Sequence, residues 1–168
     1  MLPIIILLPL ILGTTLVSQL QRFSRGVTAL GAIGISLSCF LLLLTQAETV
    51  LQGTPLIQSW DWLPQFGINL SFRLDALGLL FSLLISGIGT LIYIYAYYYL
   101  SPKNSLAKLY QLLMLFMAAM LGISLSNNLM ILLVFWELTS ISSFILVGYW
   151  SQYDSDQRGA RMSLTITG

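Results

Sequence analysis

Long apolar runs dominate this chain of 168 residues. Within each run the apolar residues are continuous and do not alternate with polar ones, which is typical of transmembrane helices and not of barrel strands. A helix needs about 20 apolar residues to cross a bilayer core about 30 Å thick. The pattern therefore predicts an all-α integral membrane fold in a single membrane domain, with five transmembrane helices over about residues 2–20, 27–47, 75–99, 108–125 and 128–150, and the start of a sixth over 160–168.

The segment from Glu48 to Arg73 departs from this pattern. Two glycines and two prolines interrupt it, two tryptophans lie in it, and the string INLSF alternates between apolar and polar residues as a short strand does. Tryptophan is favoured at membrane interfaces. We therefore expect an extracytoplasmic loop that contains a short β-hairpin and lies on the interface.

The basic residues predict how the helices are oriented. Six of the seven lie in the first, third and fifth connections, and these are Arg22, Arg25, Lys103, Lys108, Arg158 and Arg161. Because cytoplasmic loops carry the excess of lysine and arginine, these three connections are expected in the cytoplasm. The N-terminus is then extracytoplasmic, and the predicted location is the cell (plasma) membrane.

Composition agrees with a membrane protein and narrows its chemistry. Hydrophobic residues make up 57% of the chain, charged residues 8%, and the mean hydropathy is +0.89. The single cysteine, Cys39, lies inside an apolar run, and histidine is absent, which removes disulfide frameworks, cysteine clusters and the commonest metal ligand. We expect a buried, inert Cys39, no cofactor, no metal site and no nucleic-acid partner.

A tyrosine cluster marks the end of the third predicted helix. The string YIYAYYY holds five tyrosines in seven residues. Such a cluster is typical of the aromatic belt at a membrane interface. A quinone or aromatic-cofactor site is the alternative.

One carboxylate, Glu137, lies within the apolar string LLVFWELTSISSFILVGYW. In a helix that begins at Asn128 it lies roughly 14 Å along the axis, close to the bilayer midplane. An acidic residue at this depth costs about 2.5–3.5 kcal/mol, so it must have a partner, water or a proton. Ser140 follows one turn later and is expected on the same face, with Thr139, Ser142 and Ser143 around the adjoining arc, so that this face meets protein.

Two interpretations of Glu137 remain open from the residues alone. The structural one is a neutral, hydrogen-bonded glutamate that ties two helices together. The functional one is an ion-path residue that takes up and releases protons or cations, because ionisable residues inside membranes usually mark such paths. The functional interpretation is favoured, although this stretch of chain contains no second buried charge to partner the acid.

Two further polar sites have simpler explanations. Asp75 follows Arg73 by two residues at the start of the third helix, where a carboxylate is favoured by the helix dipole and an arginine anchors at the head groups. The functional alternative is that Asp75 helps form an outer ion entrance. Asn127 and Asn128 are expected to make a turn and to cap the fifth helix.

Three strings carry a resemblance to a known family: FRLDALGLLFSLLISGIGTLIYIYAYYYL, LSNNLMILLVFWELTSISSFILVGYW and RGARMSLTITG. Over about residues 55–168, and more loosely over the first two helices, the chain resembles the N-terminal region of the A subunit of the Mrp-type multisubunit cation/proton antiporters. The A subunit is similar to antiporter-like subunit 5 (L) of complex I. The Thr-Ser-Ile-Ser-Ser stretch after the Trp-Glu pair favours the Mrp protein, because complex I relatives usually replace it.

This resemblance implies an antiporter module with two inverted helical repeats inside a large assembly. It implies that Glu137 is the family's essential acid, paired with a lysine on a broken seventh helix, and that the other membrane subunits of the complex are partners. That lysine and the second repeat are absent from this sequence, and RMSLTITG stops within a predicted helix. We therefore expect an N-terminal fragment that does not transport ions alone.

The predicted function is that of a subunit of a Na⁺/proton antiporter, a transporter part and not a catalyst. Protons or cations would pass through Glu137, with Asp75 and Ser140 as possible secondary residues. The first alternative is a proton-translocating membrane-arm subunit of an NADH- or ferredoxin-quinone oxidoreductase. The second alternative is an assembly scaffold that transports nothing.

Overall fold

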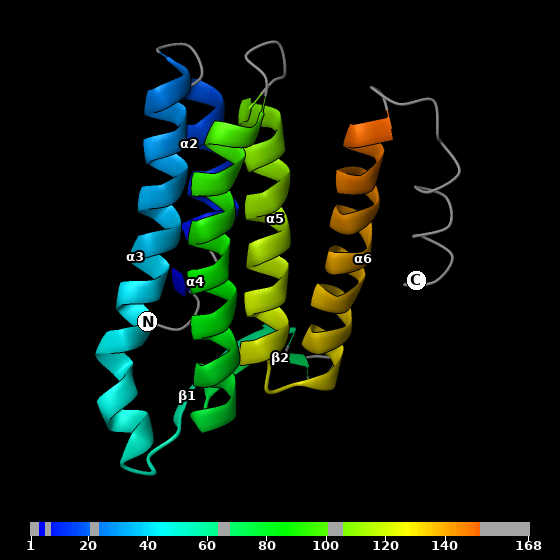
Figure 1. Cartoon of the computed structure of the whole chain (residues 1–168). Helices are drawn as coiled ribbons and strands as arrows, with labels where there is room; N and C mark the ends of the chain where they lie inside the picture. The colour runs from blue at the N-terminus through cyan, green and yellow to red at the C-terminus, as the bar shows by residue number, and fades with distance from the viewer. Residues whose placement is uncertain (1–3, 6–7, 21–23, 64–67, 101–105, 152–168) are drawn as a thin grey trace.

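Figure 1 shows the computed structural model of the chain, which describes residues 4–5, 8–20, 24–63, 68–100 and 106–151. Helices dominate it, and a two-stranded sheet lies at one end of the bundle. The elements in chain order are the π-helical turn η1 (Leu8–Leu12), α2 (Gly13–Leu20), α3 (Arg25–Leu51), β1 (Leu56–Leu63), β2 (Ile68–Leu74), α4 (Ala76–Tyr99), α5 (Leu106–Leu125) and α6 (Leu129–Ser151).

Among the described residues, α3, α4, α5 and α6 are long and apolar enough to cross a membrane. They stand side by side in chain order, each packed on the next, and α2 packs against α3 and α5 (Figure 1). The all-helical fold and its four membrane-spanning candidates agree with the pattern of apolar runs. The first predicted span, 2–20, is only partly described, and the predicted start of a sixth helix, 160–168, lies outside the described residues, so the full helix count stays a prediction.

Helix α3 is longer than the predicted span 27–47 because its capping residues lie further out. Ser24 caps the start, where its hydroxyl accepts a hydrogen bond from the Val27 amide at 3.2 Å. The helix runs past Glu48 and ends at Leu51, just before Gly53 adopts a φ of +86°. At 1.5 Å per residue such a helix is about 40 Å long and exceeds the bilayer core, which leaves Glu48 near its polar edge.

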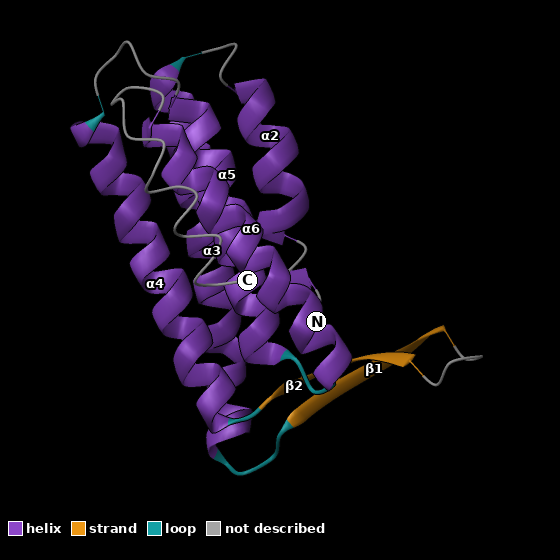
Figure 2. Cartoon of the chain, turned by 90° about the vertical axis from the view of Figure 1, so that its right-hand side faces the viewer, coloured by secondary structure: helices purple, strands orange, loops and turns teal. Residues whose placement is uncertain are grey.

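The β-hairpin predicted between the second and third apolar runs is confirmed. Strands β1 and β2 are antiparallel, with Leu56 opposite Leu74, and the pairing shifts by a bulge between Asp61 and Leu63. The hairpin extends sideways from the end of the bundle at which α4 begins (Figure 2). The Asn127 amide, in the turn between α5 and α6, donates to the Ser71 carbonyl at 3.0 Å, so the hairpin is tied to that turn.

The first described segment changes helix type around a proline. Pro9 lies in the π-helical turn η1, and it has no amide hydrogen to donate to the carbonyl four residues earlier, that of Ile5. The Cys39 thiol from α3 donates to that carbonyl at 3.6 Å. Cys39 is free and buried, as its place in an apolar run predicted, and it satisfies a backbone group that the proline leaves open.

Hydroxyl groups hold the helices together inside the bundle. Ser36 of α3 donates to the Ser86 carbonyl of α4 at 3.1 Å and accepts from Thr90 at 2.9 Å. The hydroxyls of Ser82 on α4 and Ser124 on α5 lie 2.8 Å apart. Small polar side chains allow helices in a membrane to approach closely and to bond across their interface. The core of the bundle is therefore formed where α3, α4 and α5 meet.

Candidate functional site

Helix α6 carries the acid that stands out in the sequence. Asn128 caps its start, because the side-chain oxygen accepts from the Met130 amide at 3.0 Å and the backbone carbonyl accepts from Leu132 at 2.9 Å. The predicted capping role of Asn128 is thus confirmed. Ser140 is the middle residue of the helix, and Glu137 lies three residues before it. Glu137 is therefore about 4.5 Å from the helix centre along the axis.

Glu137 and the serine one turn after it differ in exposure. Ser140 is 4% exposed and Ser142 is fully buried. Residues three apart in a helix are about 60° apart around its axis, so Ser140 lies on nearly the same side of α6 as Glu137. Glu137 is exposed, as is Trp136 beside it, at 52%. The acid therefore points away from the other described helices, next to the large apolar side chains of Leu133, Val134 and Ile141.

The hydroxyls near Glu137 bond to their own helix. Thr139 donates to the Trp136 carbonyl at 2.6 Å, and Ser143 donates to the Ser140 carbonyl at 2.9 Å. Within the described part of the chain, no hydrogen bond or ion pair joins the Glu137 carboxylate to another residue. A partner for this acid must therefore come from water or from residues beyond those described.

A glycine on α5 sets how α6 packs. The ring of Phe135 lies directly on Gly122, so closely that a Cβ atom at this glycine would lie 2.5 Å from the ring carbon Cε1. The same ring packs at 6.4 Å, between centroids, from Phe72 of β2. Phe135 precedes Glu137 by two residues, or about 200° around a helix, so the two side chains point to opposite faces. This contact could not be identified from the sequence, because a lone glycine in an apolar run shows no spacing signal.

Asp75 has the local role predicted for it. Its carboxylate accepts from the Gly78 amide at 2.8 Å and caps α4, and it lies 3.5 Å from the Arg73 guanidinium. Both charged side chains are more than 40% exposed, so the ion pair is weak. Asp75 lies at the hairpin end of α4, and α5 separates that helix from α6 (Figure 1). The structure thus does not bring Asp75 and Glu137 together, and a role for Asp75 at an ion entrance stays a prediction.

The tyrosine cluster divides between the core and the surface. Tyr93 is buried and meets the ring of Tyr110 edge-on at 5.3 Å, whereas Tyr98 is 80% exposed. Tyr95 and Tyr99 stack on the surface with their centroids 5.2 Å apart. Exposed tyrosines at the end of a membrane-spanning helix favour the interfacial belt over a buried aromatic site. Among the described residues no three His, Cys, Asp or Glu side chains cluster as metal ligands do.

Comparison with known proteins places these features in context. Residues 60–110 match the model of the N-terminus of NADH-ubiquinone oxidoreductase (complex I) chain 5. The chain is 42% identical over 167 residues to the A1 subunit of the Na⁺/H⁺ antiporter of Staphylococcus aureus, an alignment that covers 99% of this chain. It covers 21% of that relative, so the chain spans about a fifth of the length of the curated relatives it matches.

Two solved structures share the fold. One is the Mrp complex from Dietzia sp. DQ12-45-1b, with a TM-score of 0.67, 25% identity, and coverage of 87% of this chain and 16% of that one. The other is the membrane-bound sulfane sulfur reductase, an archaeal respiratory membrane complex, with a TM-score of 0.72, 23% identity, and coverage of 86% and 22%. With its four apolar helices, the chain is a multi-pass membrane protein. It is similar over nearly its whole length to part of the A subunit of a Mrp-type Na⁺/H⁺ antiporter, as the resemblance of its Trp-Glu motif predicted.

Proposed function

We propose that this chain serves in a subunit of a Na⁺/proton antiporter, and that Glu137 carries protons or cations through the membrane there. The observation that supports this most is the 42% identity to a Na⁺/H⁺ antiporter subunit over 99% of the chain. The other membrane subunits of such a complex are the proposed partners, together with the lipid bilayer, protons and Na⁺.

The position of Glu137 supports the role given to it. Glu48 lies in the last turn of α3, Arg25 begins that helix, and Lys108 lies in the first turn of α5. Glu137 is the one Asp, Glu, Lys or Arg in the four described membrane-spanning candidates that lies more than one turn from a helix end. Because an acid at that depth costs about 2.5–3.5 kcal/mol, its presence is more consistent with ion handling than with packing.

The proposed mechanism is an electrostatic switch. Glu137 stays ionised while a cationic side chain lies beside it, and it takes up a proton when that cation withdraws, because an unpaired carboxylate is costly in a low-dielectric environment. We propose that the cation is a lysine outside this sequence. The exposed face of α6 leaves room for such a partner, since α6 is far less buried by its neighbours than α5 is.

The proposed topology follows from the distribution of charge. The ends of α3, α4, α5 and α6 that lie opposite the hairpin adjoin the connections that hold six of the seven basic residues. By the positive-inside rule this end is cytoplasmic, and the hairpin and the N-terminus are outside. We propose the plasma membrane as the location, with the first apolar stretch as a fifth span and residues 160–168 as the start of a sixth.

The test is Na⁺-driven proton release from everted membrane vesicles that contain the complete antiporter complex, followed with a pH-sensitive dye. Glu137→Gln keeps the size of the side chain and its hydrogen bonding but cannot ionise. We expect it to reduce exchange to the level of vesicles without the complex. Glu48→Gln, a matched change in the last turn of α3, should leave exchange unchanged.

Two outcomes would contradict the proposal. Full exchange by the Glu137→Gln complex would show that this carboxylate carries no ions. If the variant instead lost its partner subunits on native gels, whereas the complex that remained transported normally, the residue would serve assembly, as the scaffold alternative holds.

A second candidate function rests on the family match at residues 60–110. That match is to chain 5 of complex I, so the chain could serve as a proton-translocating membrane-arm subunit of a quinone reductase. Purification would separate the two functions. A complex I relative would copurify with iron-sulfur subunits and support NADH- or ferredoxin-driven quinone reduction, and an antiporter would do neither.

A further inference from the structure

A groove opens between α5 and α6 at the end of the bundle opposite the hairpin. It has a volume of about 240 Å³ and is lined by Lys108 and Leu112 on α5 and by Phe144, Ile145, Gly148 and Tyr149 on α6. Apart from Lys108, the side chains that line it are apolar or aromatic. The groove lies near the ends of both helices, away from Glu137 at mid-helix.

The volume and the mainly apolar lining of the groove suit a single hydrocarbon chain. Its volume is below the roughly 300–1,000 Å³ of pockets that enclose a small-molecule ligand. Gly148 has open space beside it, because a Cβ atom at this position would have no neighbour within 4 Å. A flexible acyl chain can lie along such an apolar groove between two helices, whereas a folded ligand would not fit within it.

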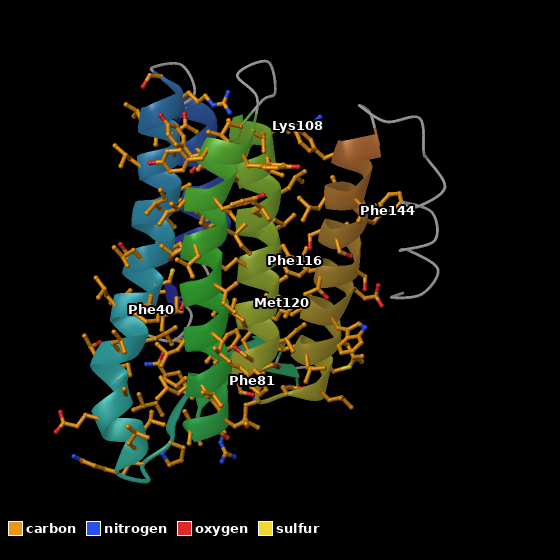
Figure 3. All side chains as sticks on the ribbon, viewed as in Figure 1. Phe40, Phe81, Lys108, Phe116, Met120 and Phe144 are labelled. Atoms are coloured by element: carbon orange, nitrogen blue, oxygen red, sulfur yellow. The ribbon has the colours of Figure 1, made fainter. Side chains whose placement is uncertain are left out.

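Lys108 supplies a positive charge at the mouth of this groove. It is the third residue of α5, its side chain is exposed, and it lies at the upper end of the helix on the side of α6 (Figure 3). No ion pair or hydrogen bond joins it to another residue in the ranges that the structure covers. A lysine near a helix end extends its ammonium group to the lipid head groups while its methylene stem covers apolar surface.

The end of the bundle that carries Lys108 also has the residue types that are found beside lipid head groups. The exposed tyrosines of α4, Tyr95 to Tyr99, lie at the same end, where interfacial aromatics belong. The connections on this side hold most of the basic residues of the chain. In the orientation proposed above they face the cytoplasmic leaflet, whose anionic lipids attract lysine and arginine near the membrane.

We infer that an anionic phospholipid binds here, with one acyl chain in the groove between α5 and α6 and its phosphate on Lys108. Charge complementarity selects this occupant, because a zwitterionic lipid would gain less from the ammonium group and a purely apolar helix would leave it unpaired. The inference does not depend on which ion the complex transports.

The experiment uses the complete complex in vesicles of phosphatidylcholine that contain a minority of phosphatidylglycerol. A phosphatidylglycerol probe with a photoactivatable group on its acyl chain is crosslinked, and the crosslinked peptides are mapped by mass spectrometry. We expect crosslinks at Leu112, Phe144 or Ile145. Unlabelled phosphatidylglycerol should compete for the site about fivefold better than phosphatidylcholine, which corresponds to the attraction of one lysine to an anionic surface.

Substitutions separate the charge from the groove. Lys108→Gln should abolish the fivefold preference for phosphatidylglycerol, and Lys108→Arg should keep it. Gly148→Leu should fill the groove and remove the crosslinks. Gly34→Leu on α3 is the matched control, since a Cβ atom there also meets nothing within 4 Å, and it should leave the crosslinks unchanged.

Three results would overturn the inference. The first is equal competition by both lipids in the unmodified complex, and the second is persistence of the crosslinks in Gly148→Leu. The third is a combined result, in which the unmodified complex gives no lipid crosslinks and the Gly148→Leu complex loses a partner protein. That result would mean that a helix of the partner protein occupies the groove. Lys108→Gln changes an exposed side chain, so it tests the charge even if the leucine variant fails to assemble.

Discussion

The contact between Gly122 on α5 and Phe135 on α6 gives a sharp test of how the two helices pack. In Gly122→Ala the added methyl group would lie 2.5 Å from Cε1 of the ring, and it would be closer still to Cδ1 and Cγ. This is at least 0.9 Å short of the 3.4 Å at which ordinary van der Waals contact begins. The atoms in the way belong to a rigid ring that also packs on Phe72, so the two helices must move apart or the ring must leave its position.

Two opposing effects decide the size of the change. Overpacking of this kind costs typically about 1–3 kcal/mol. Replacing a helical glycine with alanine gains roughly 0.8–1.0 kcal/mol from helix propensity alone. Gly34→Ala on α3 shows only the second effect, because its methyl group would meet nothing within 4 Å. The difference in unfolding free energy between the two variants isolates the clash, and we expect it to be about 1–3 kcal/mol, with Gly122→Ala the less stable.

The assay measures the thermal midpoint of the detergent-solubilised complex. Samples are heated to a series of temperatures, and the complex that remains intact is quantified by size-exclusion chromatography. Because the clash lowers stability by about 1–3 kcal/mol, Gly122→Ala should melt at a lower temperature than Gly34→Ala. The double variant Gly122→Ala with Phe135→Leu should recover part of that loss, because a leucine side chain can turn away from the new methyl group. Equal midpoints for the two alanine variants would refute the geometry of the α5–α6 contact.

Two further predictions concern hydrogen bonds made by α4. Asp75→Ala removes the cap that accepts from the Gly78 amide and should lower stability by about 1 kcal/mol. Asp75→Asn keeps an acceptor and should lower stability less in the same melting assay. A loss of ion exchange in both variants without a loss of stability would instead support the ion-entrance role. Tyr110→Phe removes the buried hydrogen bond to the Tyr93 carbonyl at 2.6 Å and should lower stability by about 0.5–1.5 kcal/mol, and an unchanged midpoint would show that this bond contributes nothing.

Much of this fold could be predicted from the sequence because its signals are local. The apolar runs located α3, α4, α5 and α6 to within a few residues at most ends, since only an apolar helix can satisfy its backbone inside a bilayer. The alternating INLSF string and its flanking turns located the hairpin. The end of α3 lay further along the chain than expected, because Glu48 is compatible with a helix that extends beyond the apolar core, and the break comes only near Gly53.

The direction in which Glu137 points could not be predicted in the same way. A helix that is apolar on all sides shows no periodicity to reveal which face meets a neighbour. The spacing of Glu137 and Ser140 places them on one face of α6, but it does not reveal that Glu137 is exposed whereas Ser140 is 4% exposed. The outward direction of Glu137 depends on the contact between Phe135 and Gly122, which lie 13 residues apart on different helices.

The same contacts fix both coordinates of the acid. Its depth along the axis follows from where α6 begins. That start is tied to the hairpin, because the side-chain NH2 group of Asn128 donates to the Asn69 carbonyl at 3.1 Å while the side-chain oxygen of Asn128 caps the helix. Its direction follows from the ring of Phe135, which is held against Gly122 on the opposite face. Contacts within the described chain thus fix the part of α6 that carries Glu137, whereas the partner that would charge and discharge the carboxylate is proposed to lie outside. If this is correct, Gly122→Ala should lower ion exchange at temperatures where the complex is still assembled, because it turns or shifts the acid without removing it.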